Sequence, residues 1–164
     1  MIVFKKVINM KKYLPNLILL IIWMFVIFNY SNQNADISSS TSDRLIIKTI
    51  ETIKHTKLSE EEKEEILDKF TIYIRKGAHL FLYFILAILS YSLLYIKYDL
   101  KPITIIYTLI FCFIYACTDE LHQTFIPGRS GEFKDVLIDS LGSIIFLIFP
   151  TIIYLLKSPS KKSL

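Results

Sequence analysis

The residues best suited to chemistry lie in short polar clusters beside long apolar runs. The first cluster spaces Arg75, His79 and Tyr83 four residues apart, with Lys76 next to the arginine. Residues at this spacing share one face of a helix. Histidine exchanges a proton near neutral pH, and the planar guanidinium of arginine binds phosphate and carboxylate groups. This face is therefore suited to holding an anion beside a titratable group.

Two further clusters carry mainly carboxylates. One ends the third apolar run and the other begins the fourth, and a short connection rich in proline and glycine joins them. Their candidate residues are Asp119, Glu120, Gln123, Arg129, Asp135 and Asp139. An ionisable group inside a transmembrane helix costs about 2.5–3.5 kcal/mol on insertion unless it faces protein, water or an opposite charge. We therefore expect His79 and Asp139 to face inward and the three clusters to form one shallow polar site.

The composition is typical of a multi-span membrane protein. The 164 residues are 53% hydrophobic and 21% charged, so the two kinds must be segregated along the chain. A helix needs about 20 apolar residues to cross the hydrocarbon core. We predict an all-α integral membrane protein in which residues 1–164 form one domain. The predicted transmembrane helices cover residues 14–30, 78–96, 102–118 and 136–156.

The long connection between the first two runs, residues 31–74, is predicted to be partly helical. Three isoleucines recur at helical spacing between Asp43 and His55, and Ser59 with Glu62 fits a capping box that opens a second helix. We expect these helices to lie on the outer membrane surface or to cover the bundle. The alternative is a solvated connection without a further role.

The distribution of lysine and arginine predicts that both termini are cytoplasmic. Nine basic residues flank the runs on the side of the termini, whereas the eight basic residues between positions 31 and 77 are outnumbered by nine acidic ones. Positively charged flanks stay in the cytoplasm. The polar site then lies at the outer face of the cell membrane. A cleaved signal peptide is the alternative for the first run, but the following residues 31–35 lack a small-x-small cleavage site.

Several classes of function are disfavoured. The net charge of +4 comes from lysines beside apolar runs rather than from a basic aromatic surface, so no nucleic acid partner is predicted. Neither a P-loop nor a GxGxxG motif is present, and no cofactor is predicted. A metal site drawing on the acids, His79 and His122 is an alternative, but HExxH and paired-histidine spacings are absent, so no metal is predicted.

The polar clusters resemble those of the VanZ-like family. Residues 75–83 fit RKxxHxxxY, residues 119–129 fit DExxQxFxPxR, and residues 135–142 fit Dxxx(N/D)xxG, in this order. Asp139 stands where the family often has Asn. The resemblance implies a small multi-pass bacterial membrane protein, in a family named after a member linked to reduced susceptibility to teicoplanin-type antibiotics.

Our leading hypothesis is that the site engages an anionic lipid, a lipid-linked cell-envelope headgroup or a lipid-bound glycopeptide. Arg75, Lys76 and Arg129 would hold phosphate or carboxylate while the acids orient them. The predicted partners are therefore membrane lipids, with lipid-linked cell-wall intermediates or a lipoglycopeptide. A second hypothesis is an enzyme that modifies such an intermediate, with His79 and Glu120 as acid and base. A third is a structural bundle or partner subunit whose arginines and aspartates only neutralise one another.

Overall fold

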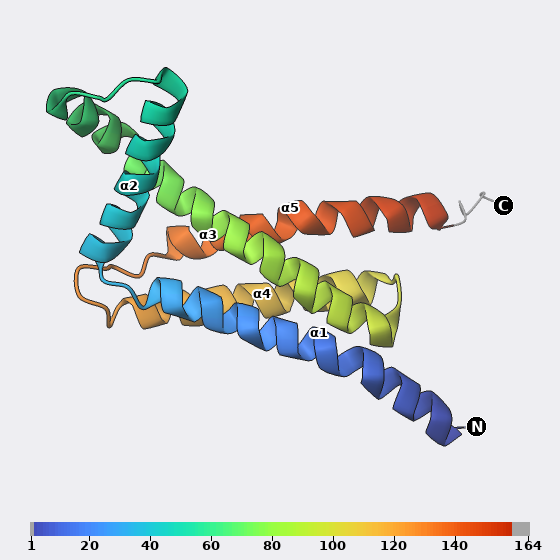
Figure 1. The fold of residues 1–164 in the computed structure, drawn as a ribbon. Helices are drawn as coiled ribbons and strands as arrows, with labels where there is room; N and C mark the ends of the chain where they lie inside the picture. The colour runs from blue at the N-terminus through green and yellow to red at the C-terminus, as the bar shows by residue number, and fades with distance from the viewer. Residues whose placement is uncertain (1, 159–164) are drawn as a thin grey trace.

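The apolar runs form a helical bundle, which Figure 1 shows as a ribbon. The computed structural model describes residues 2–158, and every regular element within them is an α-helix. Four helices contain a segment long and apolar enough to cross a membrane, which confirms the predicted fold class. The helices are α1 (Ile2–Ser31), α2 (Ala35–Lys54), α3 (Glu60–Tyr98), α4 (Pro102–Gln123) and α5 (Phe133–Lys157).

Short connections fix the directions of the last three helices. Residues 99–101 join α3 to α4, and Pro102 occupies the first position of α4, where its missing N–H costs nothing. Residues 124–132 join α4 to α5. Such short links hold neighbouring helices antiparallel. The end of α4 and the start of α5 therefore lie together at one end of the bundle, beside the end of α1 (Figure 1).

The connection between α1 and α3 is more helical than the sequence predicts. The α2 helix begins at Ala35, well before the expected start at Asp43. Within this serine-rich stretch, the hydroxyl of Ser42 finds a partner inside the helix, because it donates to the carbonyl of Ser38, one turn earlier, at 3.2 Å. The predicted helix end is confirmed, because His55 is the C-cap of α2.

The helix that the capping box opens does not stop before the second span. The Ser59–Glu62 capping box is present in both directions, as predicted. From there α3 continues unbroken to Tyr98, so the helix that the capping box opens and the predicted span 78–96 form one helix. As Figure 1 shows, α2 and the first turns of α3 stand beyond the other helices as a hairpin. Thr71 of α3 donates to Asp43 of α2 at 2.6 Å and helps to join its two arms.

The core of the bundle lets α3 and α5 approach closely. Tyr83, Leu86 and Cys112 are completely buried there. A Cβ atom added at Gly142 of α5 would collide with the backbone carbonyl of Leu80 in α3. Small residues at helix contacts are typical of membrane bundles, in which close backbone packing replaces the hydrophobic effect. This contact sets the spacing of the two helices just below the polar clusters.

The first helix is part of this packed bundle. Trp23 donates from Nε1 to the carbonyl of Leu82 at 2.9 Å, and Tyr115 donates to the carbonyl of Met24 at 2.7 Å. Ile27 is completely buried. Both ends of the described chain lie at the end of the bundle away from the hairpin (Figure 1). The two termini are thus on the same side of the bundle.

Candidate functional site

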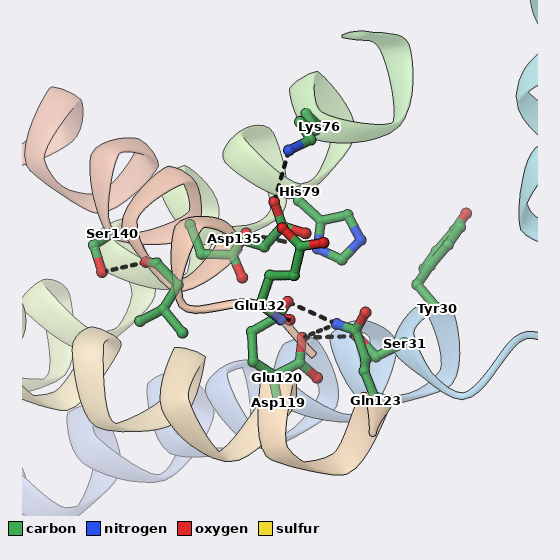
Figure 2. A network of polar contacts seen from close by, with 12 residues as sticks. Tyr30, Ser31, Lys76, His79, Asp119, Glu120, Gln123, Glu132, Asp135 and Ser140 are labelled. Carbon is green, nitrogen blue, oxygen red and sulfur yellow. Dashed lines mark hydrogen bonds and ion pairs between the residues drawn. The ribbon is translucent and has the colours of Figure 1, made fainter. Parts of the chain in front are cut away.

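The three polar clusters meet at the hairpin end of the bundle, around one cavity. The cavity has a volume of about 240 Å³. It is formed by α3, the end of α4, the start of α5 and the connection between the last two. Its lining residues are Ile72, Arg75, Lys76, His79, Glu120, Gln123, Gly128, Arg129, Ser130, Glu132, Asp135, Ile138 and Asp139. The polar network around it is drawn in Figure 2.

The deepest part of the site joins three helices through ionisable side chains. His79 of α3 places Nδ1 3.6 Å from Oδ1 of Asp139 in α5. One ligand atom from each of His79, Asp119 and Asp139 lies within 4.8 Å of the others. Asp139 is completely buried, and Asp119 is 4% exposed. Among the described residues, these three side chains are close enough together to hold a metal ion.

Asp119 is held by a residue from α1 that the site prediction omitted. The hydroxyl of Ser31 donates to Oδ2 of Asp119 at 2.7 Å, and Ser31 is completely buried. Gln123 donates to the same oxygen at 3.4 Å. Ser31 ends α1, so the first helix supplies a polar group to the site. No spacing in the sequence indicates this role, because a serine after an apolar run is also typical of a simple helix end.

Gln123 connects the acidic and basic parts of the site. Its Nε2 donates to Oε1 of Glu120 at 3.0 Å, and its Oε1 accepts from Arg129 at 3.0 Å. The other oxygen of Glu120 accepts from the backbone N–H of Glu132 at 3.1 Å. In Figure 2, dashed lines run from the amide nitrogen of Gln123 to the carboxylates of Asp119 and Glu120. The network therefore fixes the connection between α4 and α5 over the end of α4.

The two arginines of the site form no ion pair with a described side chain and can therefore still bind an anion. Arg129 donates to Gln123 and, at 3.3 Å, to the carbonyl of Tyr30, while its buried Nε has no partner among the described residues. Among the side chains that the structure describes, those of residues 13–35 and 38–158, no carboxylate lies within ion-pair distance of Arg75 or Arg129. Burial and the positive charge of Arg75 lower the pKa of Arg129 from its usual value. An arginine nevertheless remains charged at physiological pH.

Lys76 differs from the arginines because it already has a partner. Its Nζ lies 2.9 Å from Oδ1 of Asp135, and both side chains are partly exposed (Figure 2). This is the cross-helix pair that a purely structural bundle would use. The same explanation does not extend to Arg75 and Arg129, because among the residues described they form no such pair.

Most of the predicted site residues line the cavity, and the others lie close behind it. Asp119 approaches His79 and Asp139 from the α4 side. Tyr83 lies one turn below His79, completely buried, and its hydroxyl has no partner among the described side chains. The three clusters converge on one cavity, as expected. The roles of these residues in binding stay predictions.

The structure changes one residue in the alternative metal site and one in the alternative acid–base pair. His122 does not join the other candidates for metal binding, because its Nε2 lies 3.2 Å from Oδ1 of Asn32 and its ring stacks on Phe28. His79 forms its closest ionisable contact with Asp139. Glu120, the acid suggested as its partner, shares the cavity but is hydrogen-bonded to Gln123 and Glu132.

Comparison with known proteins identifies the family. The family model described as VanZ/LLP1 matches residues 16–155. The match spans most of the chain and contains all the cavity-lining residues, so the chain belongs to this family, as its motifs predict. No curated protein and no solved structure gives a significant match.

Proposed function

We propose that this member of the VanZ/LLP1 family binds the anionic headgroup of a membrane lipid or of a lipid-linked envelope precursor in its polar cavity. The observation that carries the proposal is the pair Arg75 and Arg129. Both line the cavity, and among the described residues neither has an ion-pair partner. Two like charges at one cavity repel each other, and a bound phosphate or carboxylate removes this repulsion.

The position and size of the cavity favour a lipid headgroup. At about 240 Å³ the cavity is smaller than the roughly 300–1,000 Å³ typical of pockets that enclose a drug-sized molecule. Ile72 and Ile138 line it together with the charged residues. A phosphate group and its immediate substituent fit this space, while the apolar part of the same molecule stays among the lipids around the bundle. A lipoglycopeptide would place only one charged group there.

The orientation in the membrane is part of the proposal. Lysines flank the spans at the end that carries both termini, so the positive-inside rule places this end in the cytoplasm. The cavity then opens toward the outer leaflet of the cell membrane. Lipid-linked intermediates of the cell envelope and lipid-bound antibiotics are found at that surface.

Binding can be measured on the purified protein in detergent. Isothermal titration calorimetry with short-chain phosphatidylglycerol, short-chain phosphatidylcholine and inorganic phosphate separates an anionic lipid from a neutral lipid and a free anion. We expect phosphatidylglycerol to bind most tightly and its affinity to fall at least tenfold in the Arg75→Gln/Arg129→Gln double variant, since each lost charge-assisted contact costs about 1.5–3 kcal/mol.

A matched control is an arginine outside the cavity. Arg44 is exposed on α2 and does not line the cavity, so Arg44→Gln removes the same charge without touching the site. Its affinity should equal that of the unaltered protein. Equal affinity in the double variant and the unaltered protein would contradict the proposal, and tighter binding of inorganic phosphate than of phosphatidylglycerol would contradict its lipid part.

An enzyme acting on a lipid-linked intermediate is the second candidate function. The contact between His79 and the buried Asp139, below the proposed phosphate site, favours it, because a carboxylate next to a histidine supports general acid–base catalysis. Incubation of the protein with envelope lipids should then give a new product by mass spectrometry. The product should disappear in His79→Gln, and Arg44→Gln should still form it.

A further inference from the structure

We infer that His79, Asp119 and Asp139 bind a divalent metal ion at the inner end of the cavity. The three side chains come from α3, α4 and α5, and their ligand atoms lie within 4.8 Å of one another. Two atoms that each lie about 2.1 Å from a shared ion are about 3–4 Å apart, depending on the angle between them. Small side-chain rotations therefore bring the three atoms around one ion.

Asp139 supplies independent evidence that a ligand belongs there. Its side chain is completely buried, and neither carboxylate oxygen has a hydrogen-bond partner among the described residues. Nδ1 of His79 lies 3.6 Å from Oδ1, beyond ordinary hydrogen-bond distance. A buried carboxylate without partners costs several kcal/mol. A bound cation would remove this cost.

Asp119 is prepared for the same role. Its described hydrogen bonds, from Ser31 and Gln123, both fall on Oδ2. They leave Oδ1 available and fix the plane of the carboxylate. Partners of this kind, which hold a ligand from behind, are a regular feature of metal sites in proteins.

Among the described side chains, no lysine or arginine forms an ion pair with the two buried acids. Lys76 is paired with Asp135, and Arg129 donates to Gln123 and to a backbone carbonyl. With His79 neutral, the three ligands carry two negative charges, which a divalent ion would balance. Glu120 is less suited as a further protein ligand, because both of its oxygens already accept hydrogen bonds.

The ligand types indicate which metal ions fit. One imidazole nitrogen with carboxylate oxygens suits Mn²⁺ or Zn²⁺ better than ions that prefer thiolate ligands. Three protein ligands leave coordination positions open, as in catalytic rather than structural sites. Because the group lies in the headgroup cavity, a phosphate oxygen can take an open position. Only this last contact rests on the proposed function; the metal site itself rests on the three side chains.

The direct test is metal binding by the full-length protein in detergent. After removal of bound ions with EDTA and buffer exchange, MnCl₂ is titrated and free Mn²⁺ is followed by electron paramagnetic resonance, with ZnCl₂ as a competitor. We expect about one ion per chain, and an affinity at least about tenfold lower in Asp139→Asn and in His79→Gln. His122→Gln is the matched control, because this histidine lies at the same end of the bundle but contacts Asn32 and Phe28.

A second measurement follows thermal stability instead of ion binding. An ion that binds the folded chain raises its melting temperature, so Mn²⁺ should stabilise the unaltered protein and His122→Gln but not Asp139→Asn. The family pattern accepts Asn at position 139, so we expect this variant to fold. No binding and no thermal shift in the unaltered protein would overturn the metal site. Equal binding by Asp139→Asn, His79→Gln and the unaltered protein would overturn it as well.

The Arg75→Gln/Arg129→Gln variant separates this inference from the proposed function. It should bind Mn²⁺ as the unaltered protein does while its affinity for phosphatidylglycerol falls. Mn²⁺ binding without any phosphatidylglycerol binding in the unaltered protein would reject the headgroup site and keep the metal site. Phosphatidylglycerol binding that is independent of Mn²⁺, Zn²⁺ and His79 would reject the bridging contact.

Discussion

His79 and Asp139 reach toward each other from α3 and α5, with 3.6 Å between Nδ1 and Oδ1. Their contact depends on backbone packing just below it. Leu80, which follows His79, meets Gly142, which lies one turn after Asp139, so closely that no Cβ atom fits between the helices. The glycine thus sets the helix spacing that brings the histidine and the aspartate together. A family pattern that requires a glycine three residues after this position therefore has a direct physical reason.

Gly142→Ala should separate α3 from α5 and lower stability. The added methyl group would collide with the carbonyl of Leu80, which is backbone and cannot rotate away. Overpacking of this kind costs about 1–3 kcal/mol. Thermal unfolding in detergent should show a lower melting temperature. Gly77→Ala is the control, because nothing lies within 4 Å of a Cβ there and alanine favours the helix, so its melting temperature should stay equal or rise.

Ser31→Ala should destabilise the protein although it removes a single oxygen. The hydroxyl of Ser31 donates to the buried carboxylate of Asp119 at 2.7 Å, and a hydrogen bond to a charged group is worth about 1.5–3 kcal/mol. The loss should appear as a lower melting temperature in the metal-free protein. Ser92→Ala removes a hydroxyl that bonds to the carbonyl of Ile88 in its own helix, so we expect a smaller effect. An equal effect of both changes would contradict the special role of Ser31.

Gln123→Glu should make stability depend on pH in a defined direction. The amide of Gln123 donates to Glu120 and Asp119 and accepts from Arg129. An ionised glutamate cannot donate to these acids and repels them. The loss should therefore be largest at neutral pH and should shrink as the pH falls and the new carboxyl becomes protonated. Melting temperatures of both chains between pH 5 and pH 8 check this, and a pH-independent difference would contradict it.

The sequence predicts the spans and the capping box well, because hydrophobic run length and local capping are properties of short segments. It does not show that the helix of the long connection and the second span are one continuous helix. Arginine and lysine are good helix formers and one glycine costs only about 1 kcal/mol, so residues 75–77 do not interrupt it. The α3 helix continues through these residues because Lys76 and His79 both contact residues of α5.

The sequence shows which residues form the site, but not which of their side chains contact one another. His79 and His122 look equivalent as ionisable residues near span ends. The fold turns His122 toward Asn32 and Phe28 of the first helix and its connection, and leaves His79 with Asp119 and Asp139. These partners come from different helices, so no short motif contains them. A contact through a backbone group, such as that of the Glu132 N–H with Glu120, cannot be predicted from the pattern of residue types.

The proposed orientation can be tested with single cysteines. Ser130 is exposed in the connection between α4 and α5, and Lys157 is exposed at the end of α5 on the side of the termini. A membrane-impermeant maleimide should label Ser130→Cys in intact cells and Lys157→Cys only after permeabilisation. The unaltered chain measures the background from Cys112 and Cys117. The reverse labelling pattern would place the cavity at the cytoplasmic face.

Antibiotic susceptibility tests whether the polar cavity has the role that the family resemblance implies. If the protein lowers teicoplanin susceptibility by engaging a headgroup, Arg75→Ala and Arg129→Ala should lose this protection, because each removes a cavity cation without an ion-pair partner among the described residues. Asp119→Ala should lose it too, since it removes the acid that Ser31 and Gln123 hold. Growth inhibition is compared at matched membrane levels, with Arg44→Ala as the control. Protection that survives all three changes would show that the cavity has no part in resistance. Exchanging the charges of Lys76 and Asp135 tests the structural alternative, because function should be preserved if the two residues only neutralise each other.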